Sequence, residues 1–192
     1  MSRSVRRVLA VDLGATHGRL AVFESDGGRL DRRSVEVHRL DDWASFDALI
    51  DSWWSKSRKL PALEAASVAV AGPIAVDSTA GQRARLTNRS WTVDVETLRD
   101  RLAVERVGLL NDIEALALGV LDLGADGLDT VHAGVERSGH LALLVPGTGL
   151  GQACLVWDGD RYWPMASEGG HVGFAPFDAE SAALHARLSA AR

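Results

Sequence analysis

Apolar residues in this chain fall into short runs that glycine-containing turns separate, a pattern typical of β-strands. The first three runs predict strands at Val8–Asp12, Arg19–Glu24 and Leu30–His38. Tight turns between them predict an antiparallel meander. Apolar residues then recur at helical spacing from Ser45 to Lys59, which predicts a helix that ends before a proline.

The following stretch alternates strands with helices. The pattern predicts a buried strand at Ala65–Ala71, then a loop-rich passage, then a short helix at Val95–Leu102. A strand that includes Val107–Leu110 leads directly into a helix from Asp112. A meander followed by right-handed crossovers predicts a mixed β-sheet covered by helices, and therefore an α/β fold.

The last part of the chain repeats the opening pattern. Strands are expected at Leu141–Pro146, Gly151–Trp157 and Arg161–Met165, and a helix is expected at Asp178–Ala191. Placing residue 8 over residue 141 aligns both glycines of the first turn with glycines of the later one, which favours an internal duplication. The second copy lacks the crossover strands of the first. We therefore expect a small α/β domain at 1–121 and an incomplete larger domain at 122–192.

Composition narrows the class of protein. The chain has 192 residues, of which 46% are hydrophobic and 24% charged, and it carries a net charge of −5. These values are ordinary for a globular protein and give no global reason to expect nucleic acid as a partner. No apolar run reaches the ~18 residues of a membrane span. Cys154 is the single cysteine, so an intrachain disulfide and a cysteine-based metal cluster are excluded. We expect a cytoplasmic protein without a membrane partner.

A polar pair stands where the buried strand at 107–110 meets the next helix. Asn111 and Asp112 can simply begin that helix, because both residue types favour helix starts. The alternative is functional, since open α/β sheets bind ligands at the carboxyl ends of their strands. There, an amide and a carboxylate can hold a hydroxylated substrate and remove one of its protons.

Two glycine-rich turns can present backbone N–H groups to an anion, because glycine lets a phosphate approach closely. They are 12–16, DLGAT, and 147–151, GTGLG, and each carries a threonine hydroxyl. A tight turn without a ligand is the simpler interpretation of each alone. Two related turns favour a phosphate clamp, and Asp12 beside the first can hold Mg²⁺ through water.

A third polar cluster is Glu168-Gly169-Gly170-His171. Single Glu and His residues usually lie at the surface or have local partners. Two intervening glycines are expected to let both side chains turn into one pocket. Zinc is disfavoured, because the chain has neither an H-E-x-x-H motif nor a group of cysteines.

Together these motifs resemble the bacterial glucokinases, in the sugar kinase branch of the actin-like ATPase and hexokinase superfamily. The matching segments occur in family order: VDLGATHGRL, VAVAGPI, LTNRSW, LLNDIEALALG, PGTGLG and EGGHVGFAP. The resemblance implies an actin-like ATPase (ribonuclease H-like) fold with a mixed β-sheet and crossover helices. It also implies ATP-dependent phosphorylation of glucose at the 6-hydroxyl, the first step of glycolysis.

The resemblance implies a role for each motif. Asp112 would be the general base. The substrate-binding residues would be Asn111, Glu168, His171, Asn88 and Gly72. The residues near ATP would be Gly14, Thr16, Gly147, Thr148 and Gly149, with Asp12 near Mg²⁺. Glucose or a related hexose and ATP are the implied partners, and self-association into a homodimer stays open.

Two departures from the family pattern lie in the first turn, where Ala15 replaces the usual glycine and His17 the usual asparagine. The family chain is also longer than this one. The absent part would carry the adenosine-binding segment and a further sugar-binding glutamate. The alternative hypothesis is therefore a truncated, catalytically silent sugar-binding or regulatory module derived from a glucokinase.

Overall fold

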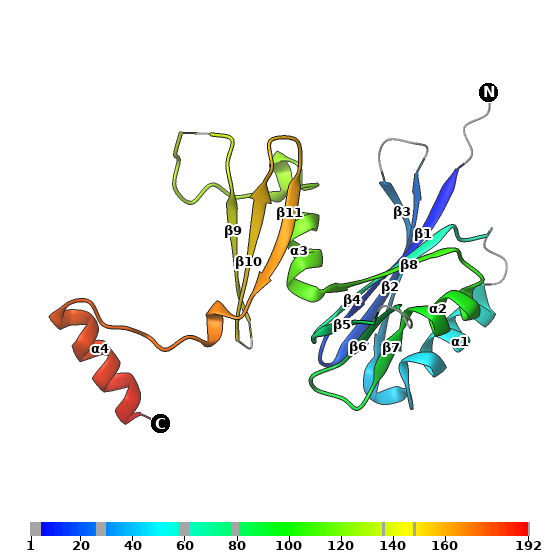
Figure 1. Cartoon of the computed structure of the whole chain (residues 1–192), viewed down its shortest axis with the longest axis horizontal. Helices are drawn as coiled ribbons and strands as arrows, with labels where there is room; N and C mark the ends of the chain where they lie inside the picture. The colour runs from blue at the N-terminus through cyan, green and yellow to red at the C-terminus, as the bar shows by residue number, and fades with distance from the viewer. Residues whose placement is uncertain are drawn as a thin grey trace. The chain divides into compact units, whose positions relative to one another are not determined.

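The computed structural model describes residues 5–25, 30–57, 62–77, 81–135, 137–147 and 149–191. The chain divides into two compact units, residues 1–136 and 137–192, and each is described by itself (Figure 1). The boundary expected at residue 121 stays a prediction of domain organisation. In the described part of the chain, no helix is long and apolar enough to cross a membrane.

The first unit is built on a five-stranded sheet, as described, in the order β3-β2-β1-β4-β8. Its strands are β1 (Arg6–Leu13), β2 (His17–Ser25), β3 (Leu30–Arg39), β4 (Ala65–Val70) and β8 (Arg106–Asn111). Antiparallel pairing of β1, β2 and β3 forms the expected meander, and β1, β4 and β8 run parallel. The predicted mixed sheet is therefore confirmed.

Two helices, α1 (Phe46–Ser57) and α2 (Val95–Leu102), contribute buried residues to the core of this unit. The unit also contains η1 (Leu40–Asp42), α3 (Asp112–Val120), which follows β8 directly, and η2 (Ala125–Gly127). The apolar face of α1 buries Phe46, Leu49 and Ile50 in one core with Leu9 and Val11 of β1. Alternate residues of β1 face this core because side chains alternate across a strand. The helices predicted at 45–59 and 95–102 are thus confirmed.

A second sheet occupies the passage that the sequence predicts as loop. Its strands, in the order β5-β6-β7, are β5 (Ile74–Asp77), β6 (Gly81–Arg85) and β7 (Thr92–Asp94). The expected loop is present at Thr87, Asn88 and Trp91, between β6 and β7, but the three strands around it were not predicted because they are short and show no clear alternation. Gln82 of β6 attaches the sheet to β8, since its Oε1 accepts a hydrogen bond of 3.1 Å from the backbone N–H of Leu109.

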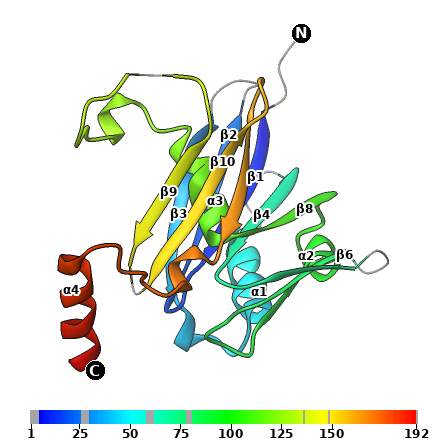
Figure 2. The ribbon, with the colours of Figure 1, turned by 60° about the vertical axis from the view of Figure 1, so that its left-hand side comes forward.

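The second unit contains β9 (Leu141–Pro146), β10 (Leu150–Trp157), β11 (Tyr162–Ser167), η3 (Gly169–His171) and α4 (Ala179–Ala190). The described strands form an antiparallel sheet in the order β11-β10-β9, seen from another side in Figure 2. The three strands and the helix predicted here are confirmed. Asp178 begins α4, where its carboxylate accepts a hydrogen bond of 2.7 Å from the N–H of Ser181.

The two glycine hairpins are similar but differ by one residue in register. Leu13 lies opposite Gly18 in the β1–β2 hairpin, whereas Pro146 lies opposite Leu150 in the β9–β10 hairpin. In both, the first glycine N–H donates across the turn, from Gly14 to the carbonyl of His17 and from Gly147 to that of Gly149. This shared hydrogen bond supports an internal duplication, which stays a prediction.

Candidate active site

The carboxyl ends of three parallel strands meet at one edge of the first sheet. Leu13 of β1 lies opposite Val70 of β4, and Val70 lies opposite Asn111 of β8. The residues that follow each strand are therefore neighbours along that edge. They carry three predicted motifs: the first glycine turn, the Gly72-Pro73 loop and the pair Asn111 and Asp112. Parallel sheets bind ligands at this edge.

Asn111 and Asp112 occupy the start of α3, as the sequence predicts for a helix cap. Asn111 is the N-cap, and its Oδ1 accepts a hydrogen bond of 3.0 Å from the N–H of Ile113. Glu114 completes a capping box by accepting from the Asn111 N–H at 3.2 Å. Asp112 also accepts from the Ile113 N–H at 3.0 Å and is half-buried. The cap therefore fixes both side chains while leaving the Asn111 amide N–H groups able to donate.

Gly72 and Asn88 lie at the same edge, beside the end of β4. Gly72 follows β4 in sequence, and Asn88 lies in a turn that is hydrogen-bonded to Ala71. A Cβ atom at Gly72 would lie 2.3 Å from the carbonyl oxygen of Arg85, so only glycine fits here without a shift. The Thr87 N–H and hydroxyl both donate to the carbonyl of Ala71, at 3.1 and 3.0 Å. These bonds fasten the turn that presents the exposed Asn88 beside the end of β4.

The first glycine turn follows β1 directly. The Gly14 N–H donates to the carbonyl of His17 at 3.1 Å, and the carbonyl of Thr16 accepts from the N–H of Leu40 at 2.9 Å. Thr16 and Ala15 are exposed at the tip. An exposed turn with fixed ends can present backbone N–H groups to an anion.

Asp12 lies on β1 beside this turn and pairs across the hairpin with Arg19, whose Nη1 is 2.8 Å from Asp12 Oδ2. Both side chains are about half exposed. Among the described residues, no group of three His, Cys, Asp or Glu side chains lies close enough to hold a metal ion. One accessible carboxylate nevertheless fits Mg²⁺, which commonly uses one or two carboxylates together with water and substrate phosphates.

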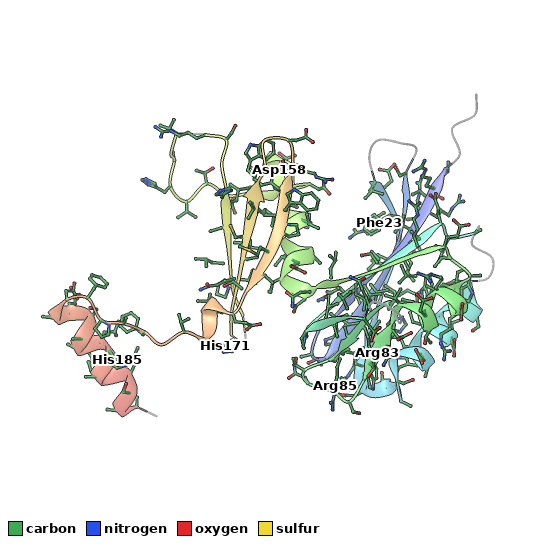
Figure 3. The ribbon with its side chains drawn as sticks, in the orientation of Figure 1. Phe23, Arg83, Arg85, Asp158, His171 and His185 are labelled. Carbon is green, nitrogen blue, oxygen red and sulfur yellow. The ribbon has the colours of Figure 1, made fainter. Side chains whose placement is uncertain are left out.

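In the second unit, Glu168 is the N-cap residue of η3 and His171, labelled in Figure 3, is its last residue. Glu168 Oε2 lies 3.7 Å from His171 Nε2, and both side chains are strongly exposed. The glycines between them also allow a close backbone approach, and their predicted role in a pocket stays a prediction. A Cβ atom at Gly170 would lie 1.8 Å from the carbonyl oxygen of Leu150, so the pair lets η3 lie directly against β10.

The second glycine turn lies at the same end of this sheet as η3, because Leu150 begins β10 and contacts Gly170. Gly147 and Gly149 are exposed and joined by a backbone hydrogen bond of 2.8 Å. Thr148 lies outside the described residues. The structure thus gathers the predicted residues into two groups, one on each unit, and each group lies at one sheet edge.

Sequence reasoning did not assign a role to Arg89, although the residue lies in the LTNRSW segment. Arg89 Nε donates to the carbonyl of Ala15 at 3.4 Å, and Nη2 donates to the Asp41 carboxylate of η1. This bond holds the pKa of Asp41 below its usual value, and the nearby positive charge of Arg89 adds to the effect. The LTNRSW motif pointed to this segment, but the contacts of Arg89 could not be predicted because Ala15 and Asp41 are distant in sequence.

The family model and the curated relatives indicate one family. The family model described as Glucokinase matches residues 9–192. A curated glucokinase from Aromatoleum aromaticum is 36% identical over 180 residues, covering 93% of this chain and 52% of its own. A glucokinase from Zymomonas mobilis is 33% identical over 186 residues, covering 94% of this chain and 55% of its own. The chain thus spans about half the length of the curated relatives it matches.

Solved structures show the same fold. Glucokinase from an Antarctic psychrotroph aligns with 95% of this chain and 56% of its own, at a TM-score of 0.79 and 26% identity. Glucokinase from Balamuthia mandrillaris, solved in complex with glucose, aligns with 98% of this chain and 54% of its own, at a TM-score of 0.70 and 23% identity. The expected actin-like ATPase fold is confirmed.

Proposed function

Because this chain belongs to the glucokinase family, we propose that it takes part in ATP-dependent phosphorylation of glucose at the 6-hydroxyl. The observation that carries the proposal is the register of β1, β4 and β8. The first glycine turn and the capped Asn–Asp pair follow strands that end at the same edge, with the end of β4 between them, and this supports one site for a phosphate and a hydroxyl. Phosphoryl transfer needs both groups held in fixed positions, because its catalysis depends mainly on positioning and charge neutralisation.

Asp112 is the proposed general base. The oxygen of the sugar 6-hydroxyl forms a bond to the γ-phosphorus of ATP as the bond from that phosphorus to the β–γ bridging oxygen breaks. The hydroxyl proton passes to the Asp112 carboxylate, and ADP leaves. The hydrogen bond from the Ile113 N–H supports this role because it holds one carboxylate oxygen and thereby orients the other.

Glucose is the proposed acceptor, and a glucokinase relative binds glucose in its solved structure. Sugar hydroxyls both donate and accept, so they require partners of both kinds. Asn111 and Asn88 offer amide groups in the first unit, with Gly72 shaping the adjoining loop. Glu168 can accept and His171 can donate in the second unit. We propose a role in hexose binding for each of these residues.

ATP and Mg²⁺ are the proposed cosubstrate and cofactor. The turn carrying Gly14 and Thr16 would bind phosphate through backbone N–H groups, and the turn from Gly147 to Gly149, with Thr148, would do the same. Asp12 would hold Mg²⁺ through water. When bound, Mg²⁺ neutralises negative charge on the β- and γ-phosphates. We further propose that the reaction takes place in the cytoplasm, and homodimer formation stays a prediction.

The test is a coupled assay of sugar-dependent ADP release over a panel of hexoses. It is run on this chain and on any longer form of the protein. The Asp112→Asn variant serves as the blank for contaminating kinases, and Asp100→Asn on α2 is the matched control at an exposed site. We expect release with glucose that Asp100→Asn retains and Asp112→Asn lacks. Equal release by wild type and Asp112→Asn, or none in any form, would overturn the proposal.

A further inference from the structure

Arg89 joins three elements of the first unit around the turn that presents Asn88. Its Nε donates to the carbonyl of Ala15 at 3.4 Å, and its Nη2 donates to the carboxylate of Asp41. The guanidinium carbon lies 5.3 Å from the ring centre of the buried Trp91. Only 19% of the Arg89 side chain is exposed, so its three partners hold it in a single orientation.

The turn that carries Arg89 is held by hydrogen bonds that do not involve the first glycine turn. The backbone N–H and the hydroxyl of Thr87 both donate to the carbonyl of Ala71 at the end of β4. The Leu86 N–H donates to the carbonyl of Trp91 at 3.1 Å and closes the turn. Arg89 therefore extends from a rigid base toward the tip of the first glycine turn.

The bond to Ala15 determines where the next N–H points. A peptide unit is planar and trans, so its C=O and N–H point in opposite directions. Directing the Ala15 carbonyl toward Arg89 therefore directs the Thr16 N–H away from Arg89. The backbone bonds of Gly14 and of the Thr16 carbonyl hold the ends of the turn but leave this peptide at the exposed tip.

We infer that Arg89 is a positioning residue for phosphate binding: it orients the Ala15–Thr16 peptide so that the Thr16 N–H faces the bound phosphate. The inference rests on the proposed function only for the identity of the ligand. The orientation of the peptide can be measured without any ligand. The hydrogen bonds of Thr87 hold the turn that carries Asn88. Loss of Arg89 is therefore expected to free the first glycine turn and to leave Asn88 in place.

The fork of the guanidinium is required, as well as its charge. Two different nitrogens reach Ala15 and Asp41 while the guanidinium carbon stays 5.3 Å from the centre of the Trp91 ring. A lysine ammonium is a single point charge and cannot occupy these positions together. Arg89→Lys therefore separates a positioning role from a role of charge alone. Arg83→Lys is the matched control, because Arg83 also binds a carboxylate, Asp94, through Nε and Nη2 at 3.0 and 2.9 Å.

The first experiment measures backbone ¹⁵N order parameters of the ligand-free chain. We expect the Thr16 value to fall from about 0.85 in wild type to below about 0.6 in Arg89→Lys and to stay unchanged in Arg83→Lys. Should Arg89→Lys fail to fold, Asp41→Asn removes the charged partner at an exposed site and is expected to lower the same value. An unchanged Thr16 value in whichever of these variants folds would overturn the inference.

The second experiment measures kinetics in a form of the protein that phosphorylates glucose. We expect Arg89→Lys to raise KM for ATP about tenfold, the effect of losing one charge-assisted hydrogen bond, and to change KM for glucose less than about twofold. An unchanged KM for ATP would overturn the role in phosphate binding. If no form phosphorylates glucose, the proposed function fails, while the order parameters still decide whether Arg89 orients the peptide.

Discussion

Gly72→Ala tests the close approach between the end of β4 and the small second sheet. The added Cβ would lie 2.3 Å from the carbonyl oxygen of Arg85, whereas ordinary contacts begin near 3.4 Å. The two backbone segments would have to separate by roughly 1 Å. Overpacking of this kind costs about 1–3 kcal/mol, and the loss of glycine freedom in the unfolded chain returns about 0.4–1 kcal/mol. We expect a net destabilisation of about 1–2 kcal/mol.

The assay is urea and thermal unfolding followed by circular dichroism. A loss of this size lowers the melting temperature by about 3–6 °C for a chain of this length. Gly108→Ala is the matched control, because Gly108 lies in β8 and a Cβ there meets nothing within 4 Å. We expect the control to be as stable as wild type or slightly more stable. If Gly72→Ala were as stable as Gly108→Ala, the requirement for glycine at 72 would be refuted.

Further predictions concern a helix cap, a carboxylate in the β10–β11 turn and a hydrogen bond between the two sheets of the first unit. Asp94→Ala removes the N-cap of α2, which accepts from the Thr97 N–H at 2.9 Å, and should lower the free energy of unfolding by about 1–2 kcal/mol in urea titration; a change under about 0.3 kcal/mol contradicts this. Hydrogen bonds from the Arg161 N–H, the Trp163 indole and the Asp160 N–H lower the pKa of Asp158 to about 2. Because the folded pKa is depressed, its stabilisation is present above the unfolded pKa of about 4 and is lost as pH falls through about 2. Asp158→Asn should therefore flatten the fall of stability between pH 5 and 2, and an unchanged pH profile would count against it. Gln82→Leu leaves the Leu109 N–H without its acceptor and should cost about 1–3 kcal/mol by the same titration, whereas wild-type stability would show that water replaces the bond.

The sequence predicted the elements that are determined by neighbouring residues, through caps, turns and apolar runs. The helix at 95–102 has the bounds the sequence predicts because Asp94 caps its start and a left-handed Ala103 ends it. The strands of both hairpins follow from apolar runs beside glycine turns. The resemblance also indicated the family, since six motifs occur in order.

Contacts between distant segments could not be predicted from these signals. The second sheet was missed because β7 has three residues and β6 carries two arginines, so neither shows a clear alternation. The need for Gly170 arises from the carbonyl of Leu150 across the fold. Arg89 meets Asp41 and Ala15 across 48 and 74 residues of sequence, and no local pattern indicates such a meeting.

In the proposed reaction, the Asp112 carboxylate accepts the proton of the sugar hydroxyl. The most direct measurement compares turnover with glucose binding in Asp112→Asn, in a form of the protein that phosphorylates glucose. A general base acts mainly in the transition state, so we expect kcat to fall by about 10²–10⁴-fold while the Kd for glucose, measured by calorimetry, stays within about threefold. Turnover close to wild type, with glucose still bound, would contradict the account.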